Sequence, residues 1–167
     1  MTINPKRIFR HLLAALWQGT RAFPMATSLA IEQEIKACEA NHVGQIRFVV
    51  EGELSGPQLY HNQSARARAI DVFSHLRMWD TEYRNAVLIY VLLADRSVEI
   101  VADRGLHVKT DAPEWDKICR NMETEFRAER FKEGAIAGIR AVSQLLTRHF
   151  PATDTKRTEQ AEKVVLI

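Results

Sequence analysis

The stretch Ala86-Val87-Leu88-Ile89-Tyr90-Val91-Leu92-Leu93-Ala94 is almost entirely apolar, and it is followed by Asp95-Arg96-Ser97 and by Val98-Glu99-Ile100-Val101. The first run is too short for most helices and rich in residues that favour strands, so it predicts a central strand covered on both faces. A connection of three residues cannot cross over to a parallel neighbour. The second run therefore pairs with the first as an antiparallel hairpin.

The segment 45–51 predicts a further strand, and helices are predicted around it in the chain. Apolar residues alternate along this segment and give it one strongly apolar face, formed by Ile46, Phe48 and Val50. Residues 52–63 have the composition of a loop, and Ser64 is a good N-cap for the helix that follows. Apolar residues at helical spacing predict further helices near 24–40, 111–127 and 132–149.

This order of elements packs most economically as three layers, with helices on both faces of a sheet. We therefore predict an α/β fold: a three-layer α/β/α sandwich with a small mixed β-sheet and an extra N-terminal amphipathic helix. The chain divides into a basic amphipathic helix at 1–22, a folded domain at 23–150 and a flexible C-terminal tail at 151–167. In the last helix, Gly134 and Gly138 predict a close approach to another element.

Composition excludes several classes of protein. The 167 residues are 46% apolar and 26% charged, which excludes global disorder. The net charge of +2 is too small to argue for nucleic acid as a partner. Cys38 and Cys119 belong to no CxxC motif and to no cluster with histidine, so a zinc site is not expected. Reduced thiols and the lack of a clear export signal favour the cytoplasm.

The N-terminal segment 1–22 carries four basic residues and no acidic one, and it has a wide apolar face. Its continuous apolar stretch, 12–17, is far shorter than the roughly 20 residues that a transmembrane helix needs. Three interpretations remain open. The helix docks on its own domain, it makes a peripheral contact with an anionic membrane through residues 5–18, or it is a mitochondrial-type presequence.

Several spaced patches of this sequence resemble the TPM domain family. They are Asn85-Ala86-Val87-Leu88-Ile89, Asp95-Arg96-x-Val98-Glu99-Ile100-Val101-x-Asp103-x-Gly105, Thr110-Asp111-Ala112, Phe126-Arg127, Phe131-x-x-Gly134 and Gly138-Ile139. The resemblance covers roughly residues 25–150. Within the family, it resembles more specifically a short bacterial branch that begins with a basic apolar helix and contains a His-x-Gly-[Glu/Gln]-Ile-Arg-Phe strand, here His42 to Phe48.

This resemblance implies an α/β/α sandwich, in agreement with the pattern of elements. It also implies two activities that are attributed to some family members, phosphatase activity and calcium binding. Most members carry an export signal and a C-terminal membrane span, and we expect neither in this chain. The sequence further departs from the family at Ala86, where a glycine usually follows the asparagine.

Three polar residues are candidates for a metal site. Because the third strand runs antiparallel to the second, Asp103 is expected near the loop that precedes Ala86, which carries Asp80 and Asn85. Their oxygens are suited to a hard cation such as calcium, which takes six to eight oxygen ligands. Glu82 and Asp111 are spare candidates. The alternative is that these residues only form turns and cap helices.

A phosphatase needs positive charge and N–H donors around the phosphoryl group, together with a nucleophile or a metal-activated water. Arg84, Arg104 and the Gly105 amide are the anion-binding candidates, and an aspartate is the candidate to attack or to position water. No C-x5-R, D-x-D-x-T or H-x-x-E-H motif is present in the sequence. The catalytic residues of such an enzyme are therefore left unassigned.

The leading functional hypothesis is a TPM-like binding or interaction module with a calcium site in a loop cleft. Its partner would be an unidentified protein or a phosphorylated ligand, and the membrane contact through residues 5–18 would make it membrane-peripheral. The alternative is a metal-assisted acid phosphatase, that is, a phosphomonoesterase. The sequence leaves open whether the chain is an enzyme.

Overall fold

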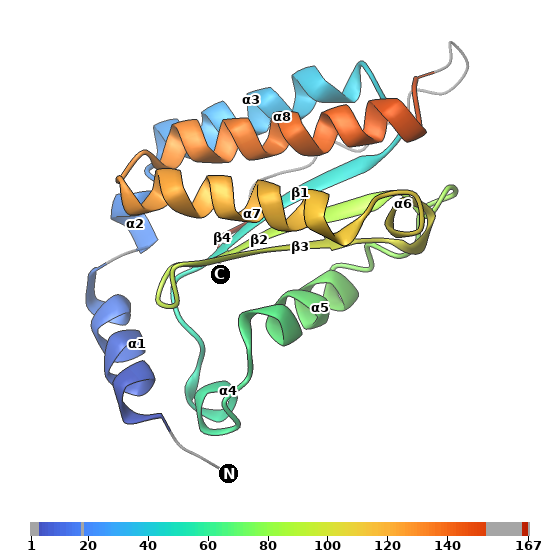
Figure 1. The fold of residues 1–167 in the computed structure, drawn as a ribbon. Coiled ribbons are helices and arrows are strands. Elements are labelled where there is room, and N and C mark those ends of the chain that lie inside the picture. Colours follow the sequence, from blue (N-terminus) through green and yellow to red (C-terminus); the bar gives the residue numbers. More distant parts are fainter. Residues whose placement is uncertain (1–3, 18, 153–164, 167) are drawn as a thin grey trace.

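A mixed sheet with helices on both faces forms the centre of the computed structural model, which describes residues 4–17, 19–152 and 165–166 (Figure 1). The strands lie in the order β3-β2-β1-β4. Strand β1 is parallel to β2 and to β4, and β2 is antiparallel to β3. Their bounds are β1 Gln45–Glu51, β2 Ala86–Leu92, β3 Ser97–Ala102 and β4 Val165–Leu166. The α/β class, the hairpin and the mixed sheet are confirmed.

The two faces of the sheet pack against different helices. On one face, alternate strand residues such as Phe48 and Ile89 contact α3 (Met25–Glu39), α7 (Ala112–Arg127) and α8 (Phe131–His149). On the other face, Leu88 and Tyr90 pack with α5 (Ala65–His75). All seven residues of β2 are therefore buried, as its continuous apolar run predicted. The result is the predicted three-layer sandwich.

Burial on both faces of the sheet corrects one expectation about β1. Alternation along 45–51 predicted a single apolar face, but Val49 and Glu51 on the other face are buried as well. They are covered because the layer that contains α5 packs on that side of the sheet. The pattern of one strand does not reveal this second layer.

Helices α7 and α8 pack closely at the two predicted glycines. A Cβ atom at Gly138 would lie 2.2 Å from Sδ of Met122, and one at Gly134 would lie 2.8 Å from Cβ of Glu125. A side chain at either position would collide with α7. The predicted close approach is thus confirmed, and a larger residue at either position would force side chains of α7 to shift.

Two short helices were not predicted. The expected loop 52–63 contains α4 (Gly56–Tyr60), which begins with a capping box in which the Ser55 N–H donates to Oε1 of Gln58 at 2.8 Å. Helix α6 (Arg104–His107) follows β3 directly. A single turn has no apolar periodicity to reveal it. Asp111 is the N-cap of α7, but its side chain makes no capping hydrogen bond.

The two ends of the chain complete the fold. The predicted N-terminal helix is present as α1 (Pro5–Trp17), with the short α2 (Gly19–Ala22) after it. Within the described residues, no helix is long and apolar enough to cross a membrane. Most of the predicted C-terminal tail, residues 153–164 and 167, lies outside the described residues, whereas Val165–Leu166 pair with β1. Cys38 and Cys119 are free thiols.

Candidate functional site

Four segments meet at the end of the sheet where β2 begins and β3 ends. We call this end of the sheet the loop edge. The backbone N–H of Asp103 donates to the Ala86 carbonyl, and that of Gly105 donates to the Arg84 carbonyl, each at 2.8 Å. Nδ2 of Asn85 donates to the Val43 carbonyl at 3.2 Å. Two contacts bring in the end of α8: Val43 N–H to Phe150 O at 3.1 Å, and Lys109 Nζ 4.3 Å from the Phe150 ring centre.

Asp103 is the most unusual residue of the loop edge. It is the N-cap of α6, and its Oδ1 accepts from the Arg104 N–H at 2.7 Å. The residue is only 8% exposed, and its Oδ2 has no hydrogen-bond partner within the part of the chain that the structure describes. A buried carboxylate oxygen without a donor is costly unless something compensates its charge. A bound cation would do so.

The other two predicted metal ligands, Asn85 and Asp80, have different surroundings. Asn85 is buried, and its backbone N–H donates to Oγ1 of Thr81 at 3.2 Å. The hairpin register places Asn85 one residue before the partner of Asp103 on the neighbouring strand. Asp80 is exposed on the preceding loop. Among the described residues, no group of three histidine, cysteine or acidic side chains is placed to hold a metal, so any cation here needs other oxygens.

The anion-binding candidates surround the contact between α6 and the loop before β2. A Cβ atom at Gly105 would lie 2.5 Å from the Tyr83 carbonyl oxygen and 2.6 Å from that of Arg84. The Gly105 N–H is already engaged with the Arg84 carbonyl. Arg84 and Arg104 are exposed. Positive charge for an anion at this place would therefore come from their guanidinium groups rather than from the Gly105 amide.

Two further buried polar side chains were not proposed as site residues from the sequence. Neither ring nitrogen of His42 has a well-formed hydrogen bond within the described residues, and Oγ1 of Thr110 also lacks a partner there. Burial lowers the pKa of His42, with a weaker opposing effect from the Gly44 backbone, so the ring is neutral at pH 7. The six histidines are dispersed in the sequence, which hid the position of this one beside Val43.

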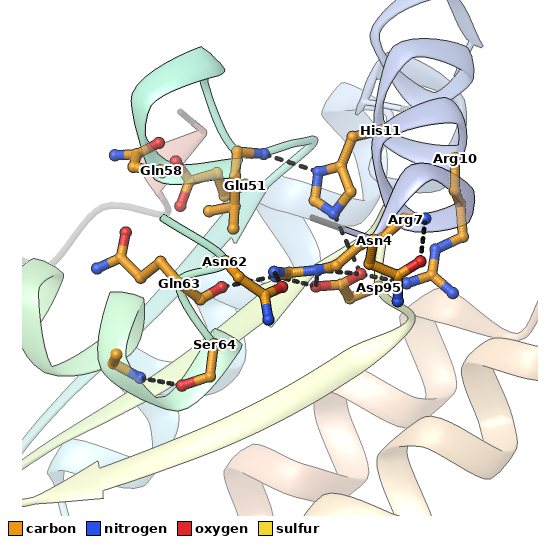
Figure 2. A network of polar contacts seen from close by, with 12 residues as sticks. Asn4, Arg7, Arg10, His11, Glu51, Gln58, Asn62, Gln63, Ser64 and Asp95 are labelled. Atoms are coloured by element: carbon orange, nitrogen blue, oxygen red, sulfur yellow. Dashed lines mark hydrogen bonds and ion pairs between the residues drawn. The ribbon is translucent and has the colours of Figure 1, made fainter. Parts of the chain in front are cut away.

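At the opposite end of the sheet, where β2 ends and β3 begins, a dense network of polar contacts surrounds Asp95 (Figure 2). In open α/β sheets, ligands commonly bind beyond the carboxyl ends of the parallel strands, and here α1 lies at that position. Arg7 donates to Oδ2 of Asp95 through Nε at 3.0 Å and through its terminal nitrogen at 2.7 Å, and Arg10 also donates to Asp95. Arg7 additionally donates to the Gln63 carbonyl at 2.7 Å.

His11 connects Asp95 to the loop after β1. Its Nδ1 accepts from the Leu54 N–H at 3.0 Å, so Nε2 is the nitrogen that donates to Oδ1 of Asp95, 3.1 Å away. Burial alone would raise the pKa of Asp95, but hydrogen bonds from Arg7, His11 and Arg10 outweigh it and lower the pKa to about 2. The groups of this network satisfy one another, which indicates a structural role: holding α1 on the domain.

We expect acid to weaken the docking of α1. Because the pKa of Asp95 is lowered in the folded chain, its ion pairs contribute stability above the usual aspartate pKa, near 4, and lose it as the pH falls toward about 2. Asp95→Ala should have the same effect at pH 7. The measurement is amide hydrogen exchange of α1 relative to β2, with Asp116→Ala as a control on α7. Unchanged protection of α1 in Asp95→Ala would contradict this role.

A second buried carboxylate, Glu51, ends β1 on the face that α5 covers. Nε of Arg68 donates to its Oε2 and a terminal nitrogen to its Oε1, each at 2.8 Å. The Tyr90 hydroxyl also donates to Oε2. Burial, and then the neighbouring Glu51 carboxylate, raise the pKa of Tyr90, so the phenol stays protonated. These groups bind one another, which indicates that they support β1 and β2.

Comparisons with known proteins agree with this geometry. The TPM domain family model matches residues 20–145. The NMR structure of the BA42 protein from the psychrophilic bacterium Bizionia argentinensis is 28% identical with a TM-score of 0.73, over 84% of this chain and 92% of that one. The N-terminal domain of a P. gingivalis protein is 18% identical with a TM-score of 0.58, over 83% and 91%, and shows the fold alone. No curated protein matches the chain.

Proposed function

The chain belongs to the TPM domain family, and from this we propose that its domain is a binding module that holds a calcium ion at the loop edge. Asp103 would supply the charged ligand, Asn85 an amide oxygen and the exposed Asp80 a further carboxylate, with backbone carbonyls and water completing the set of oxygens. The partner of such a module would be a protein or a phosphorylated ligand that meets the exposed side of the ion.

The observation that carries this proposal is the buried Oδ2 of Asp103, which lacks a hydrogen-bond donor in the described residues. The other carboxylate oxygen of Asp103, Oδ1, accepts a hydrogen bond from the backbone N–H of Arg104 at the start of α6. This bond orients the carboxylate and would leave Oδ2 for a ligand. Oxygen donors of this kind suit a hard cation rather than a thiolate-seeking metal.

We expect calcium to stabilise the protein and Asp103→Asn to abolish the effect. A ligand at a hundred times its Kd adds about 2.7 kcal/mol to the free energy of unfolding. For a chain of this size, that corresponds to a rise in Tm of roughly 5–10 °C. The measurement is thermal unfolding in EDTA and in rising calcium, with magnesium as a comparison. Asp116→Asn is the matched control, because Asp116 is an exposed acid on α7.

Two results would reject the site. Calcium that leaves Tm unchanged in the wild-type protein would remove the cation from the proposal. An equal rise in the wild-type and Asp103→Asn proteins would move the cation away from the loop edge.

Hydrolysis of phosphomonoesters is the second candidate function, and the exposed Arg84 and Arg104 beside Asp103 favour it. These cations would bind the phosphoryl group, and a bound metal ion would activate water. The same samples can be assayed with an aryl phosphate, with and without calcium. Turnover that is equal in the wild-type and Asp103→Ala proteins would come from a contaminant and would reject an activity at this site.

A further inference from the structure

Helix α1 is docked on the domain by its polar side and exposes its apolar side. Arg7, His11 and Ala14 lie one turn apart and face the domain, and they are largely or fully buried. Phe9, Leu12 and Leu13 are 63%, 61% and 48% exposed. The wide apolar face read from the sequence therefore points away from the core at these three positions.

This orientation is the reverse of that of an ordinary surface helix, which buries its apolar stripe and exposes its charges. It is held by specific polar contacts. The Asp95 carboxylate binds Arg7, Arg10 and His11, and the Leu54 N–H binds the other side of the imidazole. Rotating α1 to bury Phe9 and Leu12 would break these interactions, so the exposure of the apolar face is built into the docking.

The charged residues that α1 itself carries are all basic. No acidic residue occurs before Glu32 in the sequence. Lys6 is exposed on α1, and the Arg10 side chain is 51% exposed although it reaches Asp95. Apolar side chains beside basic ones suit a helix that lies in the interface of an anionic bilayer. We propose that the outer face of α1, formed by Phe9, Leu12 and Leu13 with Lys6 and Arg10, binds an anionic lipid surface.

The same observations disfavour a second copy of this chain as the occupant. Two copies of the face would bring like charges together, whereas an anionic surface complements them. Three exposed apolar side chains on one helix also fall well short of the roughly 1,000 Å² that a stable protein interface buries. The proposed lipid contact is separate from the loop edge, because α1 lies at the other end of the strands from α6 (Figure 1).

The test is co-sedimentation of the full chain with vesicles, in EDTA so that the proposed calcium site plays no part. One set of vesicles is phosphatidylcholine alone and the other is equal parts phosphatidylcholine and phosphatidylglycerol. We expect binding to the anionic vesicles, weakened at high salt by screening. Leu12→Asp should reduce the bound fraction about tenfold, since it places a carboxylate in the apolar face. Leu29→Asp, at a half-exposed leucine on α3, is the matched control and should bind as the wild type does.

Several outcomes would overturn the proposal. They are a wild-type chain that stays in the supernatant with anionic vesicles, equal binding to neutral and anionic vesicles, and equal binding by Leu12→Asp. Self-association without lipid that Leu12→Asp abolishes would instead assign the face to a second copy. Circular dichroism of each variant ensures that a loss of binding reflects the surface and not the fold.

Discussion

Replacing Glu51 with alanine is expected to lower the free energy of unfolding by about 3–5 kcal/mol. The carboxylate is 5% exposed, and it accepts hydrogen bonds from Arg68 and from the Tyr90 hydroxyl. Without this carboxylate, the largely buried guanidinium of Arg68 and the fully buried phenol of Tyr90 lose their hydrogen-bond acceptor. Most of the lost stability comes from these two buried donors that are left unsatisfied. Urea unfolding monitored by circular dichroism measures the change.

Two variants test the cause of this effect. Tyr90→Phe removes one hydrogen bond and leaves no buried charge unpaired, so its cost should be nearer 1 kcal/mol. Glu34→Ala removes an ion pair with Arg140 that lies at the surface, and it should shift the unfolding midpoint far less than Glu51→Ala does. Equal effects of Glu34→Ala and Glu51→Ala would show that burial is not the source of the loss.

Gly105→Ala is expected to cost about 1–3 kcal/mol, the usual range for inserting a carbon atom where there is no room. The new methyl group would meet two backbone carbonyl oxygens, those of Tyr83 and Arg84, at 2.5 and 2.6 Å. Backbone cannot move aside as a flexible side chain can, so α6 must separate from the loop before β2. Because Asp103 caps α6, the calcium response proposed above should weaken together with the stability.

The matched control for this variant is Gly52→Ala. A Cβ atom at Gly52 would meet nothing within 4 Å, and no described glycine has a positive φ, so alanine should be tolerated there. Thermal unfolding of the two variants, each with and without calcium, separates the loss of stability from the loss of binding. A Gly105→Ala protein as stable as Gly52→Ala would contradict the close contact between α6 and the loop edge.

Most of the fold could be read from the sequence because it depends on local patterns. The apolar run at Ala86–Leu92 required burial on both faces, and the short connection to Ser97–Ala102 required an antiparallel pair. The same hairpin placed Asp103 beside the loop that carries Asn85, and the backbone hydrogen bond from Asp103 to Ala86 bears this out. The short helices α4 and α6 were not predicted, because a segment of about one turn is too short to show apolar periodicity.

The candidate site was only partly visible in the sequence. The hairpin argument identified Asn85 and Asp103 as neighbours, but it could not show that one oxygen of Asp103 is buried without a donor. The hairpin argument also gave no reason to consider His42. This residue forms an isolated antiparallel β-bridge with Pro151, and the bridge brings its segment to the loop edge. Contacts between segments so far apart in the chain leave no trace in residue spacing.

Local sequence patterns were enough to predict the class of layers, the hairpin and the amphipathic character of α1, since the spacing of apolar residues is a property of each segment alone. The direction in which α1 faces depends instead on contacts between distant segments. A surface helix ordinarily buries its apolar side, but here Asp95, 84 residues along the chain from His11, binds the basic side of α1 and holds it against the domain. A half-buried carboxylate gains more from three basic partners than from water, and their positions become known only when the chain has folded.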